Sequence, residues 1–173
     1  MKHRHRRKRP VMGAAAITFR HDRRPGDDQL IVDMHRYGYA PEGDRFGLPF
    51  WEFVAETVAE AQLDQPGRSR VWFAEIDGKA VGCSALVDRG ERGQLRWVVL
   101  LPEARGTGAG RKLVELALDH ARHCGHSEVY LETTDGLASS MAIYEKMGFR
   151  TIDAHVERLW HGDGVHIIMT LQL

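Results

Sequence analysis

Three glycines alternate with other residues at the start of a predicted helix, and two arginines flank them. The stretch "LLPEARGTGAGRKLVE" covers residues 100–115 and joins an apolar run to an amphipathic segment. Glycine tolerates positive φ and lets another group approach the backbone closely. A helix N-terminus leaves backbone N–H groups free and carries partial positive charge, so it suits a phosphate. The stretch predicts an anion-binding turn, with a pyrophosphate as the best candidate ligand.

A tight turn that merely packs a helix on a sheet would need the same glycines, and a bare Gly-x-Gly pattern does not separate the two interpretations. The surrounding sequence excludes two familiar nucleotide sites. No Gly-Lys-Ser/Thr is present, as a nucleoside triphosphate loop requires. The glycines also follow the fourth predicted strand, whereas a dinucleotide-binding fold places them after its first strand.

The elements that position this turn follow from hydrophobic periodicity and turn signals. Leu30, Ile31, Met34 and Tyr37 fall at helical spacing and mark the apolar face of the first helix. We expect strands at 14–20, 127–134, 149–156 and 164–173, helices at 25–39, 50–63, 108–124 and 136–148, and a three-stranded antiparallel meander over 69–102. The order β-α-α-β-β-β-α-β-α-β-β predicts an α/β (α+β) fold with a mixed, mostly antiparallel sheet of about seven strands flanked by helices.

Two motifs in a fixed order carry a resemblance to a known family. "RGTGAG" at Arg105–Gly110 follows "WVVLLPEA" and precedes "IYEKMGF" at residues 143–149. Together they resemble the GNAT superfamily of acetyl-CoA-dependent N-acetyltransferases, and the predicted order of elements matches that fold. The resemblance implies one GNAT domain over residues 12–173, with acetyl-CoA as co-substrate. It places the coenzyme against Leu100, Leu101, Arg105, Gly106, Thr107, Gly108, Ala109, Gly110 and Arg111.

Acetyl transfer needs a neutral amine, a donor for the tetrahedral oxyanion and a proton donor for the leaving thiolate. A backbone N–H near Leu100 is the expected oxyanion donor. The resemblance implies Tyr144 as the acid, although helical spacing with Leu137 would equally make it a core aromatic. The resemblance implies Asn where this chain has Leu137, so a side-chain contact to pantetheine is either missing or supplied by Asp135 or Ser139.

The sequence identifies the general base less clearly than the general acid. Glu132 in the strand at 127–134 is our candidate for a catalytic carboxylate, and Glu75 in the meander is the alternative. Either carboxylate could instead be solvated on its strand, and a water relay would need neither of them.

The acceptor side is predicted from aromatic residues around the first two helices. We expect a primary amine of a small molecule or a peptide as the acceptor, although packing of the helices explains the aromatics equally well. The residues concerned are Tyr37, Tyr39, Phe46, Phe50 and Trp51, with His155, Trp160 and His161 closing the other side.

Four potential metal ligands, His120, His123, Cys124 and His126, lie close together in "HARHCGH". Their spacing matches no recognised ligand pattern, and histidines at a helix C-terminus also interact favourably with the helix dipole. We therefore expect no metal.

Charge is unevenly distributed although the formal net charge is zero. Residues 1–10 hold six Lys or Arg and no acid. We expect a disordered basic extension over residues 1–11 or an artefact of start-site choice; a nucleic-acid-binding arm is the alternative.

No apolar run approaches the ~20 residues of a membrane span, and no apolar region of a secretory signal follows the charges. Two cysteines form no disulfide framework, which favours the cytoplasm.

Two functions remain open at this point. The leading prediction is a GNAT N-acetyltransferase, and the alternative is a GNAT-fold module that binds acyl-CoA without turnover. A homodimer stays open, while binding to nucleic acid or to a membrane is not expected.

Overall fold

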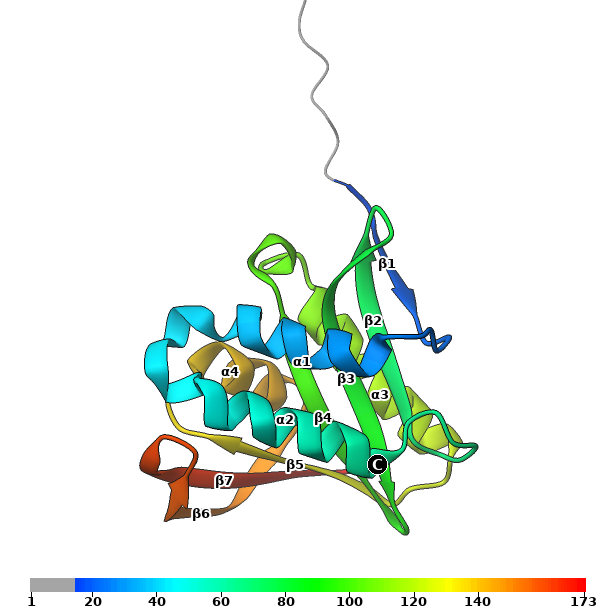
Figure 1. The fold of residues 1–173 in the computed structure, drawn as a ribbon. Coiled ribbons are helices and arrows are strands. Elements are labelled where there is room, and N and C mark those ends of the chain that lie inside the picture. The colour runs from blue at the N-terminus through cyan, green and yellow to red at the C-terminus, as the bar shows by residue number, and fades with distance from the viewer. Residues whose placement is uncertain (1–14) are drawn as a thin grey trace, which may run out of the picture.

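The computed structural model describes residues 15–173. The basic extension expected over residues 1–11 lies outside the described residues, as do the first residues of the predicted domain. Seven strands form one sheet in the order β1-β2-β3-β4-β5-β7-β6 (Figure 1). They are β1 (Ile17–Arg20), β2 (Arg70–Ile76), β3 (Lys79–Arg89), β4 (Arg92–Leu100), β5 (Glu128–Thr134), β6 (Arg150–Leu159) and β7 (Gly162–Gln172). Every neighbouring pair is antiparallel except β4 and β5, which are parallel.

Helices cover both faces of the sheet (Figure 1). Helices α1 (Asp27–Gly38) and α2 (Leu48–Ala61) pack on one face, and α3 (Ala109–His123) and α4 (Ala138–Lys146) pack on the other. Strand β2 shows how one strand serves both cores, since Val71 and Phe73 face α1 and α2 while Trp72 and Ala74 face α3. A strand that is buried on both faces reads as a continuous apolar run, as "VWFA" does.

Strands β4 and β5 stay together over a short distance only. Their parallel ladder runs from Arg92 to Gln94 on β4, and the two strands then diverge (Figure 1). A bulge in β4 accompanies this divergence, because its pairing with β3 shifts register and Trp97 adopts φ 48°. Bulges bend a strand and increase its local twist. The sheet is consequently split next to the N-terminus of α3.

The predicted order of elements is confirmed, and the predicted ends of the four helices differ from the observed ends by one or two residues. Two short 3-10 helices, η1 (Ala40–Phe46) and η2 (Pro102–Ala104), were not predicted, since their Pro and Gly residues are also typical of loops. The assignment of Tyr37 to the buried face of α1 is wrong. Its side chain is 60% exposed, whereas His35, two residues earlier, is buried.

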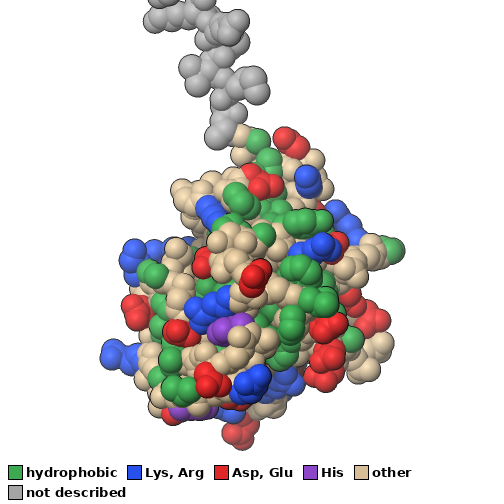
Figure 2. Space-filling view, turned by 60° about the vertical axis from the view of Figure 1, so that its left-hand side comes forward, with side chains coloured by type: hydrophobic (Ala, Val, Ile, Leu, Met, Phe, Trp, Pro, Cys, Tyr) green, Lys and Arg blue, Asp and Glu red, His purple; other side chains and the backbone are tan. Residues whose placement is uncertain are grey.

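Charged side chains of both signs are interspersed on the face that Figure 2 shows. No helix within residues 15–173 is long and apolar enough to cross a bilayer.

Candidate active site

The glycines of the turn before α3 serve two different purposes. Gly106 and Gly108 have φ of 72° and 84°, and a Cβ at either position would meet no atom within 4 Å. Gly110 lies inside the helix, where a Cβ would come within 3.0 Å of Leu100 Cδ1 and 3.3 Å of Ile143 Cδ1. The two alternatives drawn from the sequence therefore apply to different residues. Gly106 and Gly108 leave the backbone open to approach, and Gly110 allows close packing.

The polar side chains of the turn already form hydrogen bonds or ion pairs within the protein. Arg105 donates to the carbonyls of Gly38 (2.6 Å) and Leu100 (3.3 Å), and so ties the end of α1 to the end of β4. The hydroxyl of Thr107 donates to the carbonyl of Ala104 (2.6 Å). The exposed Arg111 pairs with Glu115 at 2.9 Å. Arg105 thus has a structural role, since it connects α1 to β4, and its position in the motif did not predict this role.

Leu100 and Leu101 differ in how their backbone groups are hydrogen-bonded. The N–H of Leu101 donates to the carbonyl of Val81 at 2.8 Å, so β3 already uses it. Leu100 lies on the part of β4 beyond the ladder with β5. The carbonyl of Leu100 accepts from Arg105, so of the two predicted strand residues Leu100 is the better placed to offer a backbone N–H to a ligand.

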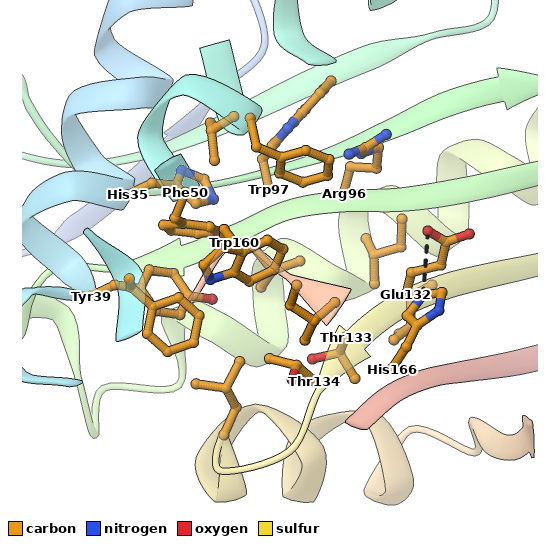
Figure 3. A pocket seen from close by; sticks show the side chains of 18 of the residues that line it. His35, Tyr39, Phe50, Arg96, Trp97, Glu132, Thr133, Thr134, Trp160 and His166 are labelled. Carbon is orange, nitrogen blue, oxygen red and sulfur yellow. Dashed lines mark ion pairs between the residues drawn. The ribbon is translucent and has the colours of Figure 1, made fainter. Parts of the chain in front are cut away.

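A cavity of about 530 Å³ opens where β4 and β5 separate (Figure 3). Its walls come from α1, η1, α2, β4, β5, α4 and the β6–β7 hairpin. It contains both predicted catalytic side chains, Tyr144 and Glu132. The remaining lining residues used below are His35, Tyr39, Phe46, Phe50, Phe53, Arg96, Trp97, Leu137, Glu157, Trp160 and His166.

Tyr144 is both a core residue and a cavity residue. Its ring packs against Phe149, with centroids 6.0 Å apart, and the side chain is 7% exposed. Burial raises the pKa of Tyr144, so the phenol keeps its proton at neutral pH. Leu137, at the position where the resemblance implied Asn, also lines the cavity. Asp135 is committed elsewhere, since it pairs with Arg45 at 2.7 Å and accepts the N–H of Val165 at 3.0 Å.

The structure separates the two carboxylates considered as a base. Glu132 lines the cavity with its side chain 48% exposed, and its Oε2 lies 3.7 Å from Nε2 of His166 (Figure 3). Glu75 is buried outside the cavity lining and accepts hydrogen bonds from Arg20 (2.6 Å) and Arg24 (3.3 Å). Glu75 is therefore part of a structural ion-pair network, and Glu132 is the carboxylate that a substrate could reach.

Part of the predicted acceptor pocket is found in the cavity wall. Tyr39, Phe46, Phe50 and Trp160 line it, and the Trp160 ring lies 5.0 Å from that of Phe50. Four of the residues predicted for the acceptor side do not line it: Tyr37, Trp51, His155 and His161. The remaining aromatic lining residues, Phe53 and Trp97, were not singled out from the sequence.

Arg96 was also missed, although a charged residue between Leu95 and Trp97 in an apolar strand was an available signal. Its guanidinium carbon lies 5.1 Å from the ring centroid of Trp97 and 5.8 Å from that of Phe53. Burial lowers the pKa of Arg96. No carboxylate of residues 15–173 lies within 4 Å of its guanidinium, in contrast to Arg20 and Arg45. Arg96 is a half-buried cation in the cavity wall that lacks an anionic partner there.

His35 gives the fold a predicted dependence on pH. Its Nδ1–H donates to the carbonyl of Ile31 (2.8 Å), and burial lowers its pKa from 6.5 to about 4. Between these values the unfolded chain binds a proton that the folded chain does not bind. The free energy of unfolding should fall by roughly 3 kcal/mol as the pH drops from 6.5 to 4. Urea denaturation at several pH values measures this loss.

The control for this prediction is His35→Asn, which cannot titrate in that range. It should start from lower stability at pH 7 because it loses packing, yet show a shallower decline with falling pH. Parallel curves for the two proteins would assign the acid sensitivity to other groups.

The four residues of "HARHCGH" do not converge as a ligand set. Nε2 of His120 is 2.9 Å from the carbonyl of Arg68, and Nε2 of His126 lies 3.9 Å from Asp88. Within residues 15–173, the group of three or more potential ligands that does converge is His155, Glu157 and His166.

A split mixed sheet with a glycine turn at the head of α3 and a cavity at the split is the arrangement of an acetyltransferase fold. The chain belongs to the acetyltransferase (GNAT) family, whose family model matches residues 35–149. This finding and the matching solved structures confirm the resemblance and the fold expected from the sequence.

Individual relatives agree with this assignment. The uncharacterized N-acetyltransferase YjgM of Escherichia coli is 35% identical over 108 residues, which cover 56% of this chain and 64% of that relative. The IAA acetyltransferase of Azospirillum brasilense is 38% identical over 124 residues, covering 70% and 74%. The chain spans less than two thirds of the YjgM protein. The yncA protein of Salmonella typhimurium, solved with its cofactor acetyl-CoA, shares the fold with a TM-score of 0.68 at 21% identity, covering 92% of this chain and 95% of that one.

Proposed function

We propose that this protein transfers an acetyl group from acetyl-CoA to the primary amine of a small molecule or peptide by direct attack. The observation that carries the proposal is the cavity at the split between β4 and β5, which contains Tyr144 and Glu132 and is lined on β4 by Gln94 to Val98, two residues before Leu100. Acetyl-CoA is supported by the solved relative that holds it and by the open glycine turn at the head of α3.

In this proposal the carboxylate of Glu132 takes a proton from the substrate ammonium, directly or through water. The neutral nitrogen attacks the thioester carbonyl, and a backbone N–H near Leu100 stabilises the resulting oxyanion. The carbon–sulfur bond then breaks, and the thiolate receives the proton of the Tyr144 hydroxyl. The acylated nitrogen returns a proton to the tyrosinate, which leaves an amide, free coenzyme A and one proton on Glu132.

The coenzyme site is tested by Gly108→Ala with Gly90→Ala as its matched control. Both glycines have positive φ, 84° and 79°, and a Cβ at either would meet no atom within 4 Å. Both substitutions should therefore cost about 1 kcal/mol of stability. Only Gly108→Ala should weaken acetyl-CoA binding, roughly tenfold or about 1.4 kcal/mol by titration calorimetry. Equal affinities in the two variants would remove the turn from the coenzyme site.

The unpaired Arg96 and the aromatic walls favour an acceptor that combines an apolar or aromatic body with an anionic group, such as a carboxylate. A half-buried guanidinium gains most from a carboxylate that it can bind with two hydrogen bonds. The rings of Tyr39, Phe50 and Trp160 offer the apolar surface.

This preference is measured with pairs of amines that differ by one carboxylate, namely aromatic amino acids and the corresponding arylalkylamines. Thiol release from acetyl-CoA should show kcat/KM at least about tenfold higher for the carboxylate form, given about 1.5–3 kcal/mol for a hydrogen bond to a charged group. Arg96→Met should abolish the preference. Arg92→Met should keep it, since Arg92 lies on the same strand but pairs with Glu128 outside the cavity.

The same assay decides between an enzyme and a non-catalytic acyl-CoA sensor. Binding of acetyl-CoA without thiol release on any amine of a broad panel would favour the sensor. We place the reaction in the cytoplasm, a proposal that the free thiols of Cys83 and Cys124 support.

A further inference from the structure

Three potential ligands converge on the β6–β7 hairpin at one wall of the cavity. His155 and Glu157 are two residues apart on β6 and therefore project from the same face of the strand. His166 on β7 lies directly opposite His155 in the antiparallel register. Gly164 lies opposite Glu157 and has no side chain, so the carboxylate has room to lean towards His166. The two imidazole rings lie 5.3 Å apart.

The distances between these atoms fit a shared ion. Oε2 of Glu157 is 2.9 Å from Nδ1 of His166 and 3.4 Å from Nε2 of His155. The ligand atoms of all three residues lie within 4.8 Å of one another. In a tetrahedral zinc site with bonds of 2.0–2.1 Å, neighbouring ligand atoms are about 3.3 Å apart. A small movement of the exposed side chains of His155 and Glu157 would complete such a set.

One of the three ligand atoms is buried without a hydrogen bond. Nδ1 of His166 is inaccessible to water and has no hydrogen-bond partner among residues 15–173, although Glu157 approaches it to 2.9 Å. A buried polar atom without a hydrogen bond destabilises the fold, because it has lost its hydration without a replacement partner. A cation between Nδ1 and the Glu157 carboxylate would satisfy both groups.

Two further carboxylates lie where the outer contacts of metal-bound histidines are usually found. Asp153 is 2.6 Å from Nδ1 of His155, the ring nitrogen that does not face Glu157. Glu132 is 3.7 Å from Nε2 of His166, again the nitrogen away from Glu157 (Figure 3). Carboxylates in these positions set the tautomer and orientation of ligating imidazoles.

We propose that His155, Glu157 and His166 form a binding site for a divalent transition-metal ion of the Zn²⁺ class at the wall of the acceptor cavity. Two imidazoles and one carboxylate are a ligand set that such ions accept, and they leave a fourth position for water or a ligand. This site differs from the "HARHCGH" residues considered in the sequence, and it changes our expectation that no metal binds.

The test uses Co²⁺ as a spectroscopic probe of the full chain after treatment with a chelator, at pH 7.5. We expect one Co²⁺ per chain with the visible absorption of a four-coordinate site, displaced by Zn²⁺. His155→Gln should weaken binding by more than about 100-fold, and Asp153→Asn by about 10- to 100-fold. Both residues are exposed, so chelator-treated variants should keep the thermal melting of the parent protein.

Other histidines and the thiol supply matched controls. The first control is the double variant His3→Gln/His5→Gln in the basic N-terminal stretch. The second is Cys124→Ser, which removes the thiol beside His120. Both variants should keep the Co²⁺ affinity of the parent protein. A thiolate charge-transfer band, loss of binding in either control, or unchanged binding in His155→Gln would overturn the proposal.

A kinetic readout rests on the proposed acetyl transfer. Because Glu157 and His166 line the cavity, bound Zn²⁺ should change the KM for the amine and leave the KM for acetyl-CoA unchanged, and His155→Gln should remove this effect. The Co²⁺ spectrum does not depend on turnover, so failure of the metal site and failure of the enzymatic proposal give different results. An effect of Zn²⁺ on amine KM that persists in His155→Gln would contradict the site.

Discussion

Replacing Tyr144 with Phe is expected to lower kcat for acetyl transfer by roughly 100-fold or more while leaving acetyl-CoA affinity unchanged. Loss of a general acid costs 10²- to 10⁴-fold, and no other hydroxyl is assigned to the leaving thiolate. The ring of Tyr144 remains as Phe, so its packing against Phe149 and the rest of the core is kept. The two measurements are thiol release under saturating substrates and calorimetric titration with acetyl-CoA.

Tyr37→Phe is the matched control, because it removes the same atom from a tyrosine that is 60% exposed and does not line the cavity. Its kcat should equal that of the parent protein. Thermal unfolding separates the two alternatives for Tyr144, since a purely structural tyrosine would change stability without this loss of kcat. Unchanged turnover in Tyr144→Phe would reject its role as the acid.

Replacing Glu132 with Gln is expected to lower kcat by about 100-fold, because the amide cannot accept a proton from the substrate ammonium. The substitution preserves size, and the side chain is about half exposed, so stability should change by less than ~0.5 kcal/mol. Single-turnover thiol release with the acetyl-CoA complex measures the chemical step directly.

Glu128→Gln is the control on the same strand. Glu128 pairs with Arg92 and lies outside the cavity lining, so its loss should leave kcat unchanged. Full activity in Glu132→Gln would mean that water or another group accepts the proton. Equal losses in both variants would point to a general effect on β5.

The parts of this protein that could be predicted are those whose cause is local. The glycine turn and its helix are continuous in sequence, so the strand, the positive-φ glycines and the helix start could be recognised together. Periodicity similarly gave the order of the elements. It misplaced Tyr37, because the apolar face of α1 is set by contacts with the sheet, and these bury His35 instead.

Only the tertiary structure showed which partners the charged side chains have. Glu75 looked like a potential base until its partner Arg20, 55 residues away, was known. Arg105 looked like a phosphate ligand, and it also ties Gly38, 67 residues away, to β4. Arg96 has no carboxylate within 4 Å of its guanidinium in the described part of the chain, which its strand sequence does not reveal. Such properties depend on which distant elements meet, and no short window of sequence contains that information.

The sequence by itself determined the family, the order of the elements and the glycine turn before α3, because these depend on local conformational preference and on contiguous motifs. The tertiary structure decided which side chains share the cavity. It places Glu132 on β5 and Tyr144 on α4 in the lining of one cavity, and it places His166 opposite His155, because the split between β4 and β5 and the register of β6 on β7 arise from long-range pairing.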